Sequence, residues 1–272
     1  MENGSGSGLR PAFTTLAALS LLLATIFASL AGAAAMRVNW NRFHFDDASS
    51  GFNPHETIIT TSTVSTLVEQ YRYATGFSIL HGAPAVSGGF VYVSGFDSQL
   101  HGRLFVYRDQ PCDHLPCTPL WQSAPSVGEL NAPTVANASV FAVSSNLGKI
   151  FAWNARGCGR SECAELWSGE MPLGNLGTYP VVTNGRVYAA GGGLLVWNAR
   201  GCGQHSCPPL WTGDMDSDVS IEGGVTVANR VAFVMSSSGR LYAFPAGGCG
   251  RPRCQPLWTA MLGLGFGGDG SH

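Results

Sequence analysis

Short apolar runs recur along the chain, and glycine, asparagine, serine or proline residues stand between them. In the set nearest the C-terminus, the pair Asn229-Arg230 and a Ser-Ser-Ser-Gly stretch at 236–239 separate the runs. Turn residues between apolar runs of this length are typical of short β-strands rather than of helices. We therefore predict four strands in this set, at 225–228, 231–235, 241–244 and 256–259.

The same arrangement occurs three more times. In the third set the pair Asn184-Gly185 separates the first two runs, and this dipeptide is strongly favoured in two-residue hairpin turns. We predict that each set forms a small antiparallel sheet. The runs of these sets lie at 84–87, 90–93 and 104–107, at 133–136, 140–143 and 150–153, and at 180–183, 187–190 and 194–197.

Several of these runs do not alternate between apolar and polar residues, and 231–235 is apolar throughout. A strand of this kind is buried on both faces, and repeated four-stranded sheets that cover one another are what propeller blades require. A parallel sheet with crossover helices would also bury both faces, but no amphipathic helical segment separates the runs. The predicted fold is all-β, a β-propeller-like array of four-stranded antiparallel blades.

Eight cysteines mark the same repeat. They form four pairs spaced Cys-x4-Cys, and a tryptophan follows each second cysteine by four residues. Successive first cysteines are 46, 44 and 47 residues apart, and so are the tryptophans, which is a strong repeat signal. The pairs are Cys112/Cys117, Cys158/Cys163, Cys202/Cys207 and Cys249/Cys254, and the tryptophans, which we predict to be packing wedges between blades, are Trp121, Trp167, Trp211 and Trp258.

This cysteine spacing favours four local disulfide bonds. Zinc ribbons use two converging Cys-x2-Cys knuckles, and redox pairs are spaced Cys-x-x-Cys, so a metal site and a redox role are the less favoured alternatives. In an oxidising compartment a pair within one loop closes a short ring, which stabilises the fold by about 2 kcal/mol.

The N-terminal region predicts export. Residues 16–35 are apolar and uncharged, they follow Arg10, and they end in small-x-small triplets of the form that signal peptidase accepts. A run of about 20 residues is also long enough to span a bilayer. We predict a cleaved signal peptide or an uncleaved anchor at 1–35, with a buried globular helix as the third alternative.

Composition narrows the function classes. Charged residues make up 12% of the chain against 45% hydrophobic residues, which excludes a disordered polyampholyte and a long surface helix. The formal net charge is −2, so no basic face for nucleic acid can be inferred. The 36 glycines favour many tight turns.

The repeats resemble those of pyrroloquinoline-quinone-type β-propellers. The core of that repeat, Tyr-Ala-Leu-Asp-Ala, then a Thr-Gly turn and a Trp, is similar to 151–155 and 195–199, and to 241–246 one residue out of step. Trp167, Trp211 and Trp258 match its end, while a cysteine-closed loop replaces the Thr-Gly turn. The resemblance covers residues 61–260 and implies the fold. Exported relatives include quinoprotein dehydrogenases and noncatalytic scaffolds of the outer-membrane assembly type.

The residues do not match what the resemblance implies for a cofactor. Quinone enzymes of this family have two adjacent cysteines, a Ca²⁺ site, a catalytic Asp and a complete eight-blade ring. No two cysteines are adjacent in this chain, and the 237 residues after Ala35 hold about five repeats of this length. We predict an incomplete ring of four blades plus an extra strand at 66–73, and no cofactor.

Other candidate chemistry is weak. The strongest metal hint is the alternating carboxylates Asp214, Asp216 and Asp218, which could converge on Ca²⁺. Val219 and Val225 stand where an EF-hand needs Gly and Glu, so a loop between blades is the plainer interpretation. A solvated turn is favoured over a metal site at Asp46-Asp47, and Asn137-Ala-Ser139 fits both a glycosylation sequon and a plain turn. The histidines, which form no paired motif, are His44, His55, His81, His101, His114, His205 and His272.

We therefore predict no catalytic, cofactor-binding or metal-ligating residue. The predicted parts are 1–35, signal peptide or anchor; 36–65, N-terminal lead-in; 66–262, repeats, with blades near 74–121, 122–167, 168–211 and 212–258; and 263–272, a Gly-rich tail.

The predicted function is that of an exported noncatalytic β-propeller binding or scaffold module, secreted or in the cell envelope, and held by residues 16–35 if they are not cleaved. Its partner would be a protein, a glycan or an envelope component, not a nucleic acid, with self-association through open blade faces as a further route. The alternative is an inactive or partial relative of the quinoprotein dehydrogenases. A substrate-cleaving propeller, such as a lyase or glycosidase, is the third candidate.

Overall fold

The computed structural model describes residues 39–69, 82–97, 101–112, 117–144, 146–172, 178–215 and 224–262. The chain divides into two compact units, Met1–Arg37 and Val38–His272, and everything described lies in the second unit. The predicted signal peptide or anchor and the Gly-rich tail lie outside the described residues. Within the described ranges, no helix is long and apolar enough to cross a membrane.

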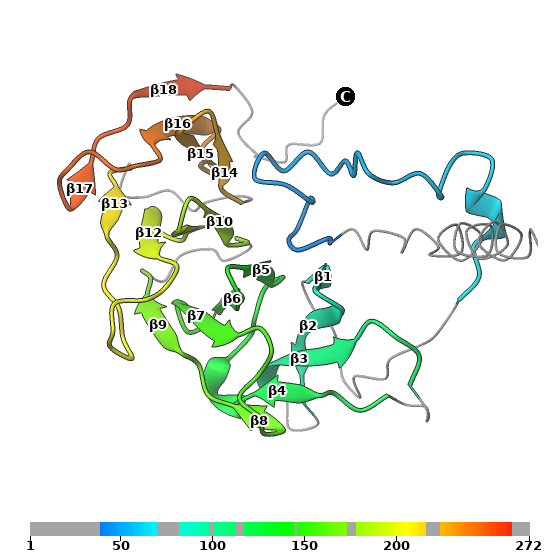
Figure 1. The fold of residues 1–272 in the computed structure, drawn as a ribbon. Helices are drawn as coiled ribbons and strands as arrows, with labels where there is room; N and C mark the ends of the chain where they lie inside the picture. The colour runs from blue at the N-terminus through cyan, green and yellow to red at the C-terminus, as the bar shows by residue number, and fades with distance from the viewer. Residues whose placement is uncertain are drawn as a thin grey trace, which may run out of the picture. The chain divides into compact units, whose positions relative to one another are not determined.

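Four sheets follow one another along the chain, and each contains the four antiparallel strands that we call a blade (Figure 1). Blade 1 has β1 (Ala85–Ser87), β2 (Phe90–Phe96), β3 (Gly102–Arg108) and β4 (Trp121–Ser123), and blade 2 has β5 (Thr134–Ala136), β6 (Ser139–Ser144), β7 (Lys149–Asn154) and β9 (Trp167–Glu170). Blade 3 has β10 (Val181–Thr183), β11 (Arg186–Ala190), β12 (Leu194–Asn198) and β13 (Trp211–Gly213), and blade 4 has β14 (Thr226–Ala228), β15 (Val231–Met235), β16 (Arg240–Pro245) and β18 (Trp258–Met261). The predicted all-β fold of repeated four-stranded sheets is confirmed.

The first hairpin of every blade turns through two residues with positive φ. In blade 3 these are Asn184, at 50°, and Gly185, at 72°. A two-residue turn with both φ angles positive matches the right-handed twist of the flanking strands, so the predicted Asn-Gly hairpin is confirmed. The equivalent turns use Gly88-Gly89, Asn137-Ala138 and Asn229-Arg230. Asn137, the first residue of the sequon, is thus a turn residue.

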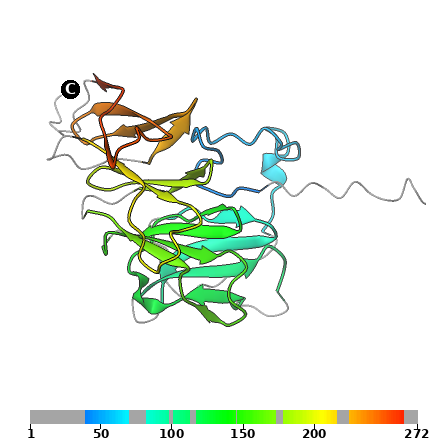
Figure 2. The same cartoon turned by 60° about the vertical axis from the view of Figure 1, so that its left-hand side comes forward.

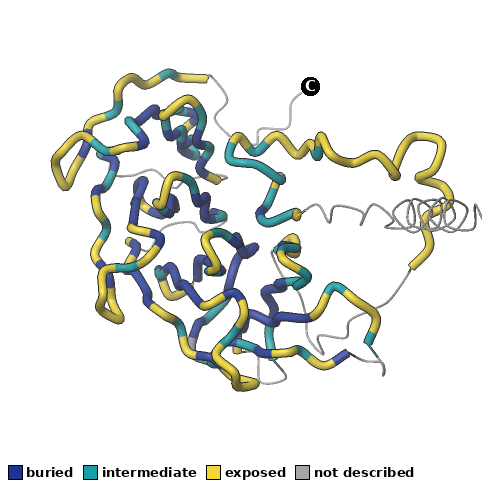
Figure 3. The backbone as a smooth tube through the Cα atoms, in the orientation of Figure 1, coloured by how far each residue is buried: buried dark blue, intermediate teal, exposed yellow. Residues whose placement is uncertain are grey.

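The hydrophobic core lies between blades (Figure 3). Three clusters of buried side chains fill the interfaces between blades 1 and 2, 2 and 3, and 3 and 4. Trp153 and Trp197 are among the largest fully buried residues. Strand β15 departs from the sequence prediction. Only Ala232 and Val234 are buried, while the other three residues are partly exposed, because none of the described blades packs on that face.

The innermost strands β1, β5, β10 and β14 contact one another in that order, and Figure 2 shows the blades side by side in chain order. The short 3₁₀ turns η1 (Val64–Thr66) and η2 (Pro125–Val127) lie outside the sheets. Residues 67–69 form no strand, and the rest of the extra strand predicted at 66–73 lies outside the described residues.

Candidate functional site

Residues 39–51, which we call the central segment, run along the inner edge of all four blades. The carbonyl of Trp40 accepts a hydrogen bond from the Val86 N–H at 2.7 Å, and that of Asn41 accepts one from Val135 at 2.7 Å. The carbonyl of Asp47 accepts one from Val227 at 3.0 Å. These three valines hold the same position in β1, β5 and β14. The segment therefore satisfies backbone groups that an inner edge strand would otherwise leave open.

Arg42 connects the central segment to blade 3, the one blade that the three backbone hydrogen bonds above do not reach. Its guanidinium donates a hydrogen bond to the Val182 carbonyl of β10 at 3.1 Å and is paired with the Asp47 carboxylate. The residue is 8% exposed. Burial lowers the pKa of Arg42, and the charge of Asp46 opposes that effect. A buried guanidinium with a carboxylate partner is a structural anchor, because either charge alone would be costly to bury.

The acidic pair in the central segment is already engaged. Asp47 pairs with Arg42, and the Asp46 carboxylate accepts hydrogen bonds from the Ser50 hydroxyl at 2.6 Å and the Ser50 N–H at 2.8 Å. The Ser50 hydroxyl and N–H hold the pKa of Asp46 below its usual range. Both residues lie in a bend or turn that is partly open to solvent, as predicted, and the Asp47 carboxylate is also paired with the buried guanidinium.

Three cavities border the central segment. The cavity of about 580 Å³ is lined by Asn41, Asp46 and Asp47 among others, and one of about 290 Å³ lies near Tyr92 and Arg156. The third, of about 270 Å³, is lined by Arg42, Phe43, His44 and Tyr179 among others.

The aromatic side chains at the third cavity are already stacked on one another. The ring centroid of Phe43 lies 3.8 Å from that of His44 and 4.2 Å from that of Tyr179. Among the described residues, no group of three or more His, Cys, Asp or Glu side chains could hold a metal ion. With both carboxylates of the central segment engaged, the described residues do not fit a quinone bound with a calcium ion.

All four predicted disulfide bonds are present, with Cα atoms 5.6 to 5.8 Å apart. Each joins the two cysteines of one loop, as the spacing predicted. The bonds join Cys112 to Cys117, Cys158 to Cys163, Cys202 to Cys207 and Cys249 to Cys254.

Three of the cysteine loops, at 157–163, 201–207 and 248–254, reach back to the preceding blade, and we call them clasp loops. Two of them add a short parallel strand there, β8 (Glu162–Cys163) on β4 and β17 (Arg253–Cys254) on β13. The other makes a single parallel bridge between Ser206 and Ser168 of β9. The disulfides thus close loops that join blades.

Cys207 shows that a purely local staple is an incomplete description. Its sulfur is bonded to Cys202 within the loop, but the residue is 3% exposed and packs in the same buried cluster as Trp167 of the preceding blade. The Cys207 N–H also donates a hydrogen bond to the Ser168 carbonyl at 2.8 Å. Unlike Cys163 and Cys254, Cys207 belongs to no strand, so the repeats that looked equivalent in sequence differ here. The local disulfide bond is present as predicted, and the loop that it closes also contacts the preceding blade.

Each clasp loop covers the tryptophan of the preceding blade. Trp121, Trp167 and Trp211 are 3%, 3% and 4% exposed. A Cβ atom on Gly157 would lie 2.7 Å from the Cδ1 atom of Trp121, which is closer than packed atoms tolerate. The same holds for Gly201 on Trp167 at 2.6 Å, and for Gly248 on Trp211 at 2.8 Å. These three tryptophans pack between blades, and the loop glycines, which sequence reasoning missed, allow that contact.

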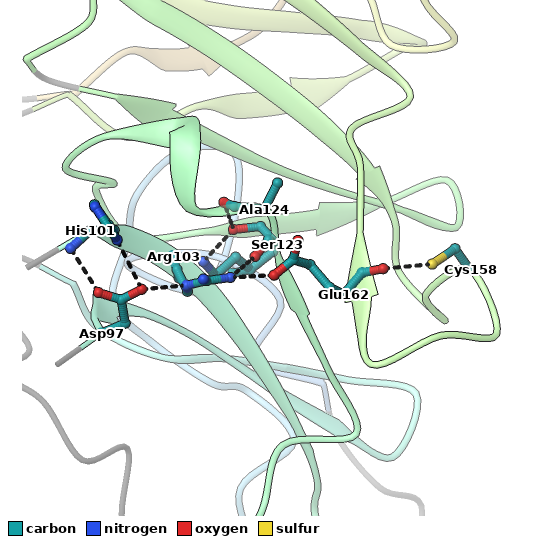
Figure 4. Close-up of polar contacts among 8 residues, drawn as sticks. Asp97, His101, Arg103, Ser123, Ala124, Cys158 and Glu162 are labelled. Carbon is teal, nitrogen blue, oxygen red and sulfur yellow. Dashed lines mark hydrogen bonds and ion pairs between the residues drawn. The ribbon is translucent and has the colours of Figure 1, made fainter. Parts of the chain in front are cut away.

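Polar side chains flank each clasp loop. Figure 4 shows Arg103 of blade 1 between Asp97 and Glu162, with its guanidinium 2.8 Å from each carboxylate and 2.8 Å from the Ser123 carbonyl. In the next clasp loop the ring of His205 lies 3.1 Å from the Glu165 carboxylate.

The last clasp loop accounts for the first residue of the predicted metal candidate. Arg253 and Gln255 donate to the two carboxylate oxygens of Asp214 at 2.8 and 2.7 Å. Asp214 therefore joins blades 3 and 4, as the plainer interpretation of that stretch suggested. Asp216 and Asp218 lie outside the described residues.

Two repeats differ from this pattern. Trp258 of blade 4 is 47% exposed, and no described loop covers it. Cys117 is buried in a cluster with Phe105 and Tyr107 of its own blade, as Cys163 is with Phe151 and Trp153, but no described blade precedes the first cysteine loop. Its sequence has Pro111 and Asp113 where each clasp loop has a glycine. The Gly-Cys-Gly triplet is thus present in the three loops that cover a tryptophan and absent from the first cysteine loop.

The remaining histidines are not brought together. His55 is exposed and His101 lies 3.3 Å from Asp97. His81, His114 and His272 lie outside the described residues. No two of the described histidines share a site.

Comparisons with known proteins agree on the fold. No family model matches the chain, and no curated protein matches it. Among solved structures, quinohemoprotein alcohol dehydrogenase from Comamonas testosteroni is 14% identical, with a TM-score of 0.59 over 86% of this chain and 44% of that one. A europium-containing methanol dehydrogenase is 15% identical, with a TM-score of 0.58 over 82% and 49%.

A lower TM-score of 0.44 is found for BamB from Moraxella catarrhalis, at 18% identity over 59% of this chain and 44% of that one. The chain spans less than half the length of each of the two dehydrogenases. At these identities the likeness shows the fold alone. The four blades therefore have a β-propeller fold of the type seen in the quinoprotein dehydrogenases.

Proposed function

We propose that the chain is an exported, noncatalytic β-propeller module that binds another macromolecule through its blades. The central segment carries this proposal. Trp40, Asn41, Arg42 and Asp47 bond to the inner strands of the four blades, so the chain itself occupies the backbone groups of the inner edge that would otherwise be open to a ligand.

The chemistry of the site supports the noncatalytic part of the proposal. The carboxylates of Asp46 and Asp47 are hydrogen-bonded or paired within the segment, which leaves neither of them poised as a general acid or base. The rings of Phe43, His44 and Tyr179, which line another of the cavities, are packed on one another.

The cysteine chemistry supports the exported part. Every cysteine belongs to a disulfide bond, and such bonds persist in oxidising compartments and are rare in the cytosol. The short rings contribute to stability only where they stay oxidised. The apolar run at 16–35 agrees with this route.

A quinone titration separates the proposal from the quinoprotein alternative. The full chain is titrated with pyrroloquinoline quinone and Ca²⁺, and both quinone absorbance and tryptophan fluorescence are recorded, with an apo quinoprotein dehydrogenase as the positive control. We expect no stoichiometric complex. A tight complex with one quinone per chain would overturn the noncatalytic proposal and favour the alternative.

A further inference from the structure

Each of the three blade interfaces contains the same binding surface, which we call a seat. A seat consists of the outer-strand tryptophan of one blade (Trp121, Trp167 or Trp211) and the outer edge of the strand that carries it. The N–H groups of Gln122, Ser168 and Thr212, one residue after each tryptophan, donate to the clasp-loop carbonyls of Ser161, His205 and Pro252 at 2.8 to 2.9 Å. The loop glycine covers the indole ring. A seat is thus filled by a loop that supplies two features, a backbone segment that pairs with the outer strand and a glycine that packs on the indole ring.

Blade 4 has the same seat without a described occupant. Its tryptophan, Trp258, is 47% exposed, against 3 to 4% for the other three. Strand β18 is the outer edge of its sheet, and no parallel strand pairs with it among the described residues. Met261 and Leu262 beside it are 59% and 50% exposed. Large apolar side chains gathered at one strand edge mark an interaction surface.

The seat on blade 4 is built like the seat on blade 2. In blade 4 the ring of Phe233 lies 6.0 Å from that of Trp258, at 52°. In blade 2 the ring of Phe141 lies 6.1 Å from that of Trp167, at 56°. The blade 2 seat is filled by the loop at 201–207, so a loop of that kind has the shape that the blade 4 seat requires.

A second copy of this chain cannot supply such a loop from its native structure. Its three clasp loops already cover Trp121, Trp167 and Trp211 in their own chain. The first cysteine loop has Pro111 at the position where Gly157, Gly201 and Gly248 have φ near +80°. Proline fixes φ near −65°, so that loop cannot take the clasp conformation.

We propose that the outer face of blade 4 binds a partner protein through a further blade that carries a disulfide-closed Gly-Cys-Gly loop. The loop glycine would cover Trp258, and the loop strand would pair in parallel with β18. At the preceding seat Asp214 bonds to Arg253 of the clasp loop, whereas Met261 stands at the same position of blade 4. This inference rests on the proposed binding function and names its partner.

The proposal is tested by fusing a blade with such a loop to the chain itself, so that a single substitution in the fused blade gives a matched control. A copy of residues 178–213, which includes the loop with Ser206 before its second cysteine, is appended after His272 of the full chain. Tethering raises the effective concentration of the loop to the millimolar range. The matched control is the same fusion with Gly201→Val in the appended copy only, which removes the bare Cα and keeps the disulfide.

Acrylamide quenching reports on Trp258, with the Trp258→Phe version of each protein subtracted to remove the other tryptophans. At this tethered concentration the Stern–Volmer constant of Trp258 should fall about threefold or more in the glycine fusion and stay unchanged in the valine control. Amide exchange of the peptide containing β18 should slow in the same fusion only. No change in the glycine fusion, or an equal change in both, would overturn the proposal.

Sedimentation of the unextended chain tests the competing occupant. A dimer that dissociates in Trp258→Glu, but not when the exposed Leu166 is changed to Glu, would assign the seat to a second copy and overturn the proposal. A monomer with quenchable Trp258 is the expected result. A quinone complex in the separate titration would overturn the proposed function without moving either of these measurements.

Discussion

At the scale of single residues, the glycines of the clasp loops decide how blades join. Gly201 and Gly203 lie two positions apart, with φ of 78° and 80°, so each needs the conformational freedom of glycine. They differ in their surroundings. A Cβ on Gly201 would lie 2.6 Å from Trp167, whereas one on Gly203 would meet nothing within 4 Å. The two positions separate backbone strain from contact with the tryptophan.

The Gly201→Ala variant should therefore lose more stability than Gly203→Ala. Positive φ costs an alanine about 1–2 kcal/mol at either position, and the clash with Trp167 adds about 1–3 kcal/mol at Gly201 alone. Urea unfolding of both variants measures the difference. Equal midpoints would contradict the tight contact between the loop and the indole.

A second prediction concerns Tyr92, whose hydroxyl donates a hydrogen bond at 3.0 Å to the Ala155 carbonyl of the next blade. Burial raises the pKa of Tyr92 to about 12, from about 10 in the unfolded chain. Because the pKa is higher in the folded chain, folding favours the neutral tyrosine. The resulting contribution of Tyr92 to the free energy of unfolding is complete below about pH 10 and is lost as the pH rises toward about 12.

Tyr92→Phe removes both the hydrogen bond and the titrating group. The variant should be less stable by about 1 kcal/mol at neutral pH. Above pH 10 wild type should lose up to about 1.4 kcal/mol per pH unit relative to the variant, so the gap should close and then reverse sign. Unfolding in urea from pH 7 to 11.5 measures both effects, and parallel curves would refute the assignment.

At the scale of elements, the disulfide rings differ in what lies before them. The rings at 158–163, 202–207 and 249–254 shape loops that reach the preceding blade, while no described blade precedes the ring at 112–117. Ring closure alone contributes about 2 kcal/mol at any of these positions. The additional contribution of a clasp loop should appear in the neighbouring blade.

Cys202→Ser/Cys207→Ser should therefore loosen blade 2 as well as its own loop. The Ser168 N–H of β9 bonds to the His205 carbonyl at 2.8 Å, and that bond depends on the closed ring. Hydrogen exchange should speed up in the β9 peptide of this variant. In Cys112→Ser/Cys117→Ser, which serves as the control, the β9 peptide should exchange as in wild type.

The strands and cysteine pairs could be predicted from the sequence because their signals are local. Asn184-Gly185 sets its own turn, and each Cys-x4-Cys pair closes within one loop. The contact of each clasp loop with the preceding blade could not be predicted, since the position of β8 beside β4 depends on how blades stack. The first glycine of each Gly-Cys-Gly triplet was a signal of that contact that the sequence does show. Pro111 stands at this position in the first cysteine loop, which covers no described tryptophan.

At the scale of the whole molecule, the central segment joins all four blades. The sequence indicated only an N-terminal lead-in there, because its contacts use backbone carbonyls of Trp40, Asn41 and Asp47 that no side-chain pattern reveals. Arg42 could not be recognised as a buried residue for the same reason. Its partner Val182 lies 140 residues away in the sequence and becomes a neighbour only when the blades assemble.

Arg42→Met tests the importance of the segment for the assembled blades. The change leaves the Val182 carbonyl without this donor and the Asp47 carboxylate, whose side chain is 37% exposed, without its ion pair, which should cost about 1–3 kcal/mol. Thermal or urea unfolding measures the loss. Arg200→Met, at an exposed position, is the control and should change stability by less than about 0.5 kcal/mol.

The backward reach of the clasp loops has a consequence for synthesis on the ribosome. A domain emerges with its N-terminal part first, and each loop that covers a tryptophan lies in the repeat made next. Trp121 therefore stays exposed to solvent until the loop at 157–163 has been synthesised. Each newly synthesised blade has an exposed apolar outer edge for the time needed to translate some 40 further residues. Delayed oxidation of the cysteines would prolong that interval, so chaperone demand should peak between repeats.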